Sequence, residues 1–265
     1  MNLLKRELAP ITPEAWAEID REAQRVLKLH LAARKVVDFK GPFGLELGAV
    51  NTGRLKNVDP PFANVSASVR VVQPLVHLWA PFKMSIAELD TVSRGATDID
   101  VDPLIRAAER IAAAEDHAVF HGYDAAAVQG VLKAADHAPL EYHGAKNLPG
   151  VIVGAKELLR KAGVGGPYAL VLGPSIYDEL HSAAEDGFPI RDRVAPMVET
   201  IVWAPALTEA AVVSMRGGDY ELTVGQDLSI GFTSFDHDTV ELYLTESFTF
   251  RVLSTNAAVA IRRKG

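Results

Sequence analysis

The sequence contains no cysteine, so disulfide bonds and thiolate metal sites are both unavailable to this chain. Basic residues are also few: 27 lysines and arginines stand against 34 aspartates and glutamates, a formal charge of −7. Domains that bind nucleic acid are usually basic, which argues against that function. No apolar run approaches the ~20 residues that span a bilayer, and charge interrupts MNLLKRELAPITPEAW before a signal-peptide core forms. A cytoplasmic protein with no membrane or nucleic-acid partner is therefore predicted.

The first clear element is a long helix near the start of the chain. Thr12 supplies a hydroxyl cap, Pro13 suits the first helical position, and Glu14 places an acid in the first turn. Apolar residues then recur every four positions, which is the spacing of one helix face. The pattern predicts a helix from residue 13 to about residue 34. Its apolar row is Ile19, Ala23, Leu27 and Leu31.

Strand periodicity replaces helix periodicity between residues 48 and 85. Apolar and polar residues alternate from Val65 to Val71, and again from Val76 to Met84. The segment NTGRLKNVDPPFAN before them carries too few apolar residues to form a core. We therefore expect this partly polar segment to pack against another chain.

The remaining two thirds mix helices and strands. An alanine-rich helix is predicted after DIDVDP, and residues 128–215 alternate between helical and strand-like segments. Residues 219–262 are mostly strand-like. At 265 residues, the chain can form one large domain or two that pack closely. The fold class is predicted to be α+β with an α/β insertion.

One glycine-rich stretch, RGGDYELTVGQDLSIGF at residues 216–232, resembles a catalytic loop in its composition. A phosphate-binding loop needs Gly-Lys-Ser/Thr at its end, and no lysine follows these glycines. A nucleophile elbow needs a glycine two residues before the serine, where Asp227 stands before Ser229. A tight turn at Gly217-Gly218 is the simplest interpretation. The stretch GVGGPY at residues 163–168 likewise fits the end of a helix better than a dinucleotide fingerprint.

Two further patterns imitate metal sites. Four acids occupy positions 1, 3, 5 and 12 of a calcium loop, but Pro103 stands where that loop needs glycine, so capping of a helix start is favoured. His117 and His121 share a helix face, but the glutamate of the zinc metalloprotease pattern is absent and a solvent-facing pair is favoured. No metal site and no catalytic set are predicted. The four acids are Asp98, Asp100, Asp102 and Glu109.

Several runs, in order, closely resemble encapsulin shell proteins, the linocin-type bacteriocin family. They begin with LLKRELAPITPEAWAEIDREAQRVLKLHLAARKVVDF at residues 3–39 and continue through AELDTVSRG, AEDHAVFHGY, GPYALVL and GFPIRDRV. They end with the glycine-rich stretch at residues 216–232 and DTVELYLTESFTF at residues 238–250. The matches cover nearly the whole chain without a large insertion. The glycine-rich stretch is thus interpreted as a family signature, and the chain as a structural protein rather than an enzyme.

The resemblance implies the tailed-phage major capsid protein (HK97-like) fold. Such subunits close into icosahedral shells, and the compact length resembles members of the smallest, T = 1, with about sixty copies. A spine helix is expected at about residues 100–122. The expected division is an N-terminal helix and arm (1–47), an extended loop (48–75), a peripheral domain (76–127 and 221–265) and an axial domain (128–220).

The family encloses a cargo enzyme, often a dye-decolorising peroxidase or a ferritin-like iron oxidase, whose C-terminal targeting peptide docks inside the shell. An extended peptide can place alternate apolar side chains in such a groove, while polar groups fix it. Leu27 and Leu31 also suit an ordinary intrachain core, and one wall can serve both purposes. The matching positions are Leu27, Leu31, Arg34, Asp38, Leu228, Ser229 and Ile230.

The resemblance also places a loop around the fivefold pore, here AAEDGFP at residues 183–189. A ring of Glu185 and Asp186 would favour the passage of cations such as ferrous iron. The same sequence also fits a solvated acidic loop that has no role in the passage of ions. The expected pore residues are Ala184, Glu185, Asp186, Gly187 and Phe188.

Some family members stack a flavin on a tryptophan before the ELD segment. Ala87 stands at that position here, and the nearby Trp79 matches a different residue of the family pattern, so no flavin cofactor is expected. A phage-type viral capsid protein is the alternative function, because it would share the fold. A secreted bacteriocin or protease is less favoured, since neither a nucleophile–base set nor an export signal is visible.

Overall fold

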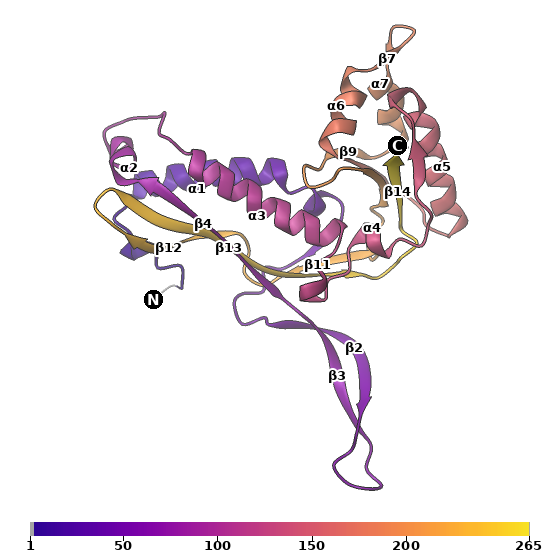
Figure 1. Cartoon of the computed structure of the whole chain (residues 1–265), viewed down its shortest axis with the longest axis horizontal. Coiled ribbons are helices and arrows are strands. Elements are labelled where there is room, and N and C mark those ends of the chain that lie inside the picture. Colours follow the sequence, from indigo (N-terminus) through magenta and orange to yellow (C-terminus); the bar gives the residue numbers. More distant parts are fainter. Residues whose placement is uncertain (1–2, 265) are drawn as a thin grey trace.

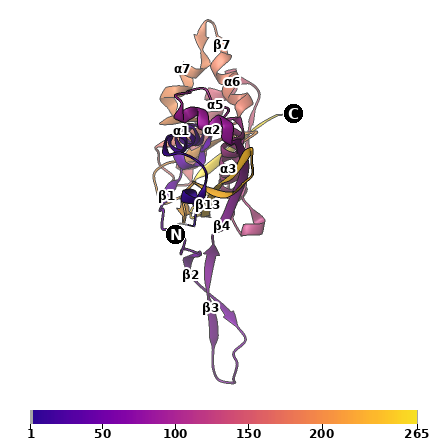
Figure 2. The ribbon, with the colours of Figure 1, turned by 90° about the vertical axis from the view of Figure 1, so that its left-hand side faces the viewer.

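The computed structural model describes residues 3–264. The molecule is a thin plate with two projections at opposite ends, the long β2–β3 hairpin and the short β7–β8 hairpin (Figures 1 and 2). Two five-stranded sheets form the plate, each with its own helices. Short 3-10 helices occur at η1 (Arg6–Leu8), η2 (Ala33–Lys35), η3 (Asp124–Ala126), η4 (Ala145–Asn147) and η5 (Ala195–Met197).

The first sheet is organised around one long strand, β13. Strands β11 and β12 pair with successive parts of the same β13 edge, β4 pairs with the other edge, and β1 joins β11 in parallel. Sequence and structure agree on the strand character of residues 219–252. The strands are β1 (Asp38–Lys40), β4 (Val76–Ser85), β11 (Tyr220–Val224), β12 (Ser229–Phe235) and β13 (Thr239–Val252).

Helices α1 (Pro13–His30) and α3 (Asp102–Phe120) pack on one face of this sheet, and α2 (Ile86–Ser93) follows β4 (Figure 1). The alternation predicted for β4 is confirmed, because Ala80, Phe82 and Met84 are buried while the residues between them are exposed. Ala107, Ala108 and Ala112 on α3 are fully buried, and their small side chains permit α1 and β4 to approach α3 closely. The spine helix spans residues 102–120, within the expected range.

The start of α1 is confirmed, but its end is not. The Thr12 hydroxyl accepts the N–H of Ala15 at 3.3 Å, as the cap predicts. The helix ends at His30 rather than near residue 34, because the Asp116 carboxylate on α3 accepts the N–H groups of Ala32 and Ala33. A tertiary contact therefore ends the helix, and the local pattern carries no signal for it.

The β2–β3 hairpin extends away from the plate (Figure 1). Its strands, β2 (Ala49–Val58) and β3 (Ala67–Pro74), pair only with each other. A two-stranded hairpin is at best marginally stable alone, and this one exposes apolar side chains instead of burying them. That agrees with the predicted need for a neighbour. The exposed side chains are Leu55, Val58, Phe62, Val65, Val69 and Val72.

The second sheet has the order β5–β14–β10–β6–β9. Strands β6 and β10 are buried at every residue, since helices and neighbouring strands cover them. The sheet contains β5 (Leu140–Tyr142), β6 (Tyr168–Leu172), β9 (Thr200–Trp203), β10 (Ala210–Ser214) and β14 (Ala258–Arg263). The helices are α4 (Val131–Ala134), α5 (Leu148–Lys161), α6 (Pro174–Ser182) and α7 (Ile190–Val194), and the short hairpin is β7 (Ala184–Glu185) with β8 (Phe188–Pro189).

The range 221–265, which the family resemblance places in the peripheral domain, contributes strands to both sheets. Strand β14 pairs with β10 and β5 in the second sheet. Its residues Ala258–Ile261 are buried there beside β10, so a strand from the end of the chain completes the core of this sheet. The chain thus crosses between the two sheets three times, after β4, after β10 and after β13.

Candidate functional site

A groove runs between α1 and the loop that joins β11 to β12. Its first part has a volume of about 470 Å³ and is lined by Leu27 and Leu31 on one side and by Leu228 on the other. A second hollow of about 260 Å³ shares Leu27 and Leu228 and adds Ser229 and Ile230. Six of the seven residues expected to dock a peptide therefore line these two hollows, and Asp38 is the exception.

The apolar wall of the groove is also part of the core. Leu27, Leu31 and Ile230 are less than a tenth exposed and belong to the same buried cluster as Ile19 and Leu104. Leu228 packs on this cluster while remaining half-buried. The two interpretations of Leu27 and Leu31 are thus compatible, since the wall is packed from behind.

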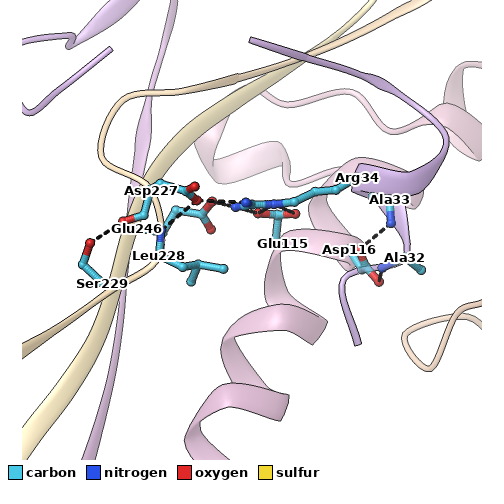
Figure 3. Close-up of polar contacts among 9 residues, drawn as sticks. All are labelled: Ala32, Ala33, Arg34, Glu115, Asp116, Asp227, Leu228, Ser229 and Glu246. Atoms are coloured by element: carbon cyan, nitrogen blue, oxygen red, sulfur yellow. Dashed lines mark hydrogen bonds and ion pairs between the residues drawn. The ribbon is translucent and has the colours of Figure 1, made fainter. Parts of the chain in front are cut away.

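Arg34 lies at the end of the groove and is held by carboxylates (Figure 3). Its Nε donates to Glu115 at 2.9 Å and its Nη1 donates to Asp227 at 2.8 Å. Its Nη2 donates to Glu115 at 2.6 Å and also to Glu246. All three guanidinium nitrogens are therefore engaged within the chain, which limits what Arg34 can offer a peptide. We call Arg34, Glu115, Asp227 and Glu246 the Arg34 cluster.

Burial dominates the electrostatics of this region. The side chains of Glu115 and Glu246 are fully buried, whereas that of Asp227 is 40% exposed. Burial, reinforced by the charge of Glu115, raises the pKa of Glu246 well above its ordinary value. Burial also raises the pKa of Asp116 to about 7, against the two backbone N–H donors that favour its ionised form.

Asp38 does not join the groove. Its Oδ2 accepts the N–H of Gly218 at 2.6 Å, and it lines a separate hollow of about 160 Å³ with Lys35 and Tyr220. Gly217 and Gly218 both have positive φ angles, of 82° and 78°, which confirms the predicted turn. The observed contact of Asp38 is thus with this glycine turn.

The structure adds groove residues that the sequence interpretation omitted. Gln24 and Lys28 are exposed on α1 and line the groove beside Leu27, and Asp227 lines it opposite them. Helical spacing from Leu27 and Leu31 is a signal that could have found the first two. Glu115 carried a weaker signal, because it follows Ile111 by four residues on the buried face of α3.

The β7–β8 hairpin forms one tip of the plate (Figures 1 and 2). Asp186 and Gly187 make its turn with φ angles of 51° and 84°, and Phe188 is 71% exposed. The Glu185 carboxylate forms an ion pair with Arg193, so the two acids of the hairpin are not equivalent. Ala184, Glu185 and Phe188 flank the turn in a two-stranded ladder.

The acids that resemble a calcium loop and the pair His117 and His121 lie on α3 or next to one of its ends. Asp100 accepts the N–H of Asp102 at 3.0 Å at the start of α3. The rings of His117 and His121 lie 5.0 Å apart, but residues 3–264 contain no group of three side chains able to hold a metal ion. In the same range, no helix is long and apolar enough to cross a membrane.

The positions considered for a flavin lie on β4 and α2. The ring of Trp79 stacks on Tyr243 with centroids 3.4 Å apart. Ala87 is exposed in the first turn of α2.

Solved structures of a virus-like particle and of a phage capsid share this architecture. A virus-like particle from Pyrococcus furiosus matches with a TM-score of 0.65 over 94% of this chain and 100% of that chain, at 15% identity. A structure described as Mycobacterium phage Cain matches with a TM-score of 0.55 over 100% of this chain and 94% of that chain, at 12% identity. At such low identity the likeness shows the fold alone. The chain has the tailed-phage major capsid protein (HK97-like) fold, with mixed α and β structure.

Sequence relatives identify the family within that fold. Residues 1–249 match the family model described as "encapsulating protein for peroxidase". The type 1 encapsulin shell protein of Rhodospirillum rubrum is 48% identical, covering 99% of this chain and 97% of its own. That of Mycolicibacterium paratuberculosis is 45% identical, covering 98% and 99%. The chain belongs to the type 1 encapsulin shell protein family. It is a self-assembling structural shell protein and not an enzyme.

Proposed function

We propose that about sixty copies of this chain close into a T = 1 icosahedral cage in the cytoplasm, and that the cage encloses a cargo enzyme. The β2–β3 hairpin supports the closed assembly, because its exposed apolar side chains have no partner surface on their own strand pair. A peroxidase is the first candidate cargo in view of the family description. A ferritin-like iron oxidase is the second, and it would link the cage to iron storage or oxidative stress.

The groove along α1 is the proposed docking site for the cargo's C-terminal targeting peptide. An extended peptide presents side chains alternately to opposite sides. Leu27, Leu31 and Leu228 offer apolar contacts along the groove, and the hydroxyl-bearing Ser229 lines the second hollow. The single observation that carries this proposal is the coincidence of an apolar hollow with the peptide-docking positions of the family.

A substitution on the rim tests the docking site without disturbing the core. Gln24 is exposed and lines both parts of the groove, so Gln24→Trp should fill it while the shell still assembles. Leu29 is 51% exposed on the same helix and does not line the groove, so Leu29→Trp is the matched control. Co-expression with a candidate peroxidase cargo that carries its C-terminal peptide should give empty shells for Gln24→Trp and filled shells for the control. Equal cargo loading would refute the groove as the docking site.

We further propose that the β7–β8 hairpin encircles the fivefold pore of the cage. The pairing of Glu185 with Arg193 favours Asp186 as the acid that sets the charge of the pore. A ring of Asp186 carboxylates would concentrate cations such as ferrous iron at the opening. On this proposal the second sheet forms the axial domain, the first sheet with α1 and α3 forms the peripheral domain, and the β2–β3 hairpin is the extended loop.

A further inference from the structure

The Arg34 cluster connects the two walls of the groove to the sheet behind it. Arg34 follows α1 in η2, Glu115 is on α3, Glu246 is on β13, and Asp227 is in the loop between β11 and β12 (Figure 3). Each carboxylate bonds the same guanidinium group. One side chain therefore joins four segments that are far apart in the sequence.

Asp227 also forms hydrogen bonds to the groove-wall residues Leu228 and Ser229. Its Oδ1 accepts a hydrogen bond from Arg34 and also from the N–H of Leu228, both at 2.8 Å. Its carbonyl oxygen accepts the hydroxyl of Ser229 at 2.7 Å. The position of the wall residues Leu228 and Ser229 thus depends on the bond between Asp227 and Arg34.

The charges in the cluster do not balance. The ionisable groups that face Glu246 are Arg34 from η2, Glu115 from α3 and Asp227 from the loop, while its neighbour on β4 is the uncharged Leu78. One cation therefore meets three acids. Within residues 3–264, the second oxygen of Glu246 is buried without a hydrogen-bond partner, an arrangement that disfavours the ionised form.

We propose that the Arg34 cluster is a proton-operated latch, in which a proton on Glu246 lets Arg34 hold Asp227 and so keeps residues 226–229 in place as a groove wall. Loss of the proton adds a buried negative charge that competes for Arg34 and repels Asp227. Asp227 is the acid that gives way, because its side chain is 40% exposed while Glu115 and Glu246 are enclosed. Arg34 is thus a positioning residue for the groove.

The direction of the pH response follows from the burial of Glu246. Since burial raises the pKa of Glu246, the proton stays bound at pH values at which an exposed glutamate is ionised. It is lost as the pH rises further. The latch is therefore closed at mildly acidic pH and opens toward alkaline pH. The consequence for cargo rests on the proposed docking function, but the opening of the loop does not.

Hydrogen exchange on empty, assembled shells tests the latch directly. Amides of residues 226–229 should exchange about tenfold faster at about pH 9 than at about pH 6 in the parent, after correction for intrinsic rates. Glu246→Gln should keep them protected at both pH values, and Asp227→Asn should expose them at both. Glu241→Gln on the same strand, whose partner is the exposed Ser234, should behave as the parent. Exchange rates in the parent that do not depend on pH would overturn the latch. So would a Glu246→Gln variant whose exchange rates depend on pH as those of the parent do. If Glu246→Gln does not assemble, Glu115→Gln replaces it, because it also removes one buried charge.

Binding of the cargo's terminal peptide to the same shells separates the two proposals. Weaker binding at about pH 9 in the parent but not in Glu246→Gln supports control of docking by the latch. Loop opening with unchanged binding refutes that control. Loop opening without peptide binding at any pH refutes the docking function and leaves the latch standing.

Discussion

The carboxylate of Asp116 accepts the backbone N–H of Ala33 at 2.8 Å, across 83 positions of the sequence. The same carboxylate accepts the N–H of Ala32 at 2.9 Å. These bonds end α1 and direct the chain toward Arg34, so a buried acid on α3 positions one end of the groove. Several consequences of this arrangement can be measured.

The stability contribution of Asp116 should depend on pH. Burial raises its pKa from 3.8 to about 7, so the folded state holds a proton that the unfolded state releases above pH 3.8. The contribution of Asp116 is then fully present below pH 3.8 and is lost as the pH rises to about 7. Asp116→Asn mimics the protonated acid, and the stability advantage of the parent over it should shrink across this window. Thermal unfolding of both proteins at several pH values measures this. An advantage that grows with pH would show that the ionised form is the stable one.

Substitution of Arg34, the cation of the Arg34 cluster, should strongly lower the stability of the subunit. Arg34→Met leaves Glu115 and Glu246 buried without their partner, and loss of one member of a buried ion pair typically costs about 3–5 kcal/mol. The urea midpoint of the subunit should fall accordingly. The matched control is Arg160→Met, because Arg160 and its ion-pair partner Glu157 are both exposed and the change should alter the midpoint little.

A compensated variant distinguishes lost charge pairing from lost packing. Glu115→Leu and Glu246→Leu added to Arg34→Met replace the buried charges with apolar groups, and stability should largely return. If the triple variant is as unstable as Arg34→Met alone, the unpaired acids are not the cause of the loss.

The tip of the β2–β3 hairpin should control assembly. Phe62 is 75% exposed on the isolated chain, and burial of one phenylalanine against a neighbour contributes about 1.5–3 kcal/mol per subunit. Phe62→Ser should therefore shift size-exclusion profiles from large particles toward free subunits. Lys56→Ser on the same hairpin is the control and should assemble normally. Intact Phe62→Ser particles of normal stability would mean that the side chain remains exposed in the cage.

The two acids of the pore hairpin should differ in effect. Asp186→Asn is expected to slow cation entry several-fold, while Glu185→Gln should have the smaller effect because Arg193 already pairs with Glu185. Quenching of an enclosed chelating dye by ferrous iron measures the rate, and entry of a neutral solute serves as the control. Equal effects of the two substitutions would contradict the assignment of the pore charge to Asp186.

Much of the secondary structure was predictable because it is encoded locally. The cap at Thr12, the alternation of β4 and the turn at Gly217-Gly218 each follow from the chemistry of neighbouring residues, and all three are confirmed. The family and fold were also predictable, because the motifs recur in order along the whole chain. The grouping of Leu27, Leu31 and Leu228 around one groove followed from that resemblance and not from their spacing.

The contacts that define the site were less accessible to prediction. The early end of α1, the pairing of β14 with β10, and the separation of Asp38 from the groove all depend on residues distant in the sequence. The capture of Arg34 by Glu115 and Glu246 belongs to the same group. Periodicity reports which face of an element is apolar, but it does not report which other element covers that face.

The sequence alone was enough to establish the approximate order of helices and strands and membership of a shell-forming family. Three-dimensional packing settled which charges meet. A buried carboxylate is tolerated only where a cation or several N–H groups lie within hydrogen-bonding distance. In the fold, these partners belong to segments that are distant in the sequence. The electrostatics of the groove and of the pore hairpin are therefore properties of the folded molecule, set by pairs such as Arg34 with Asp227 and Glu185 with Arg193.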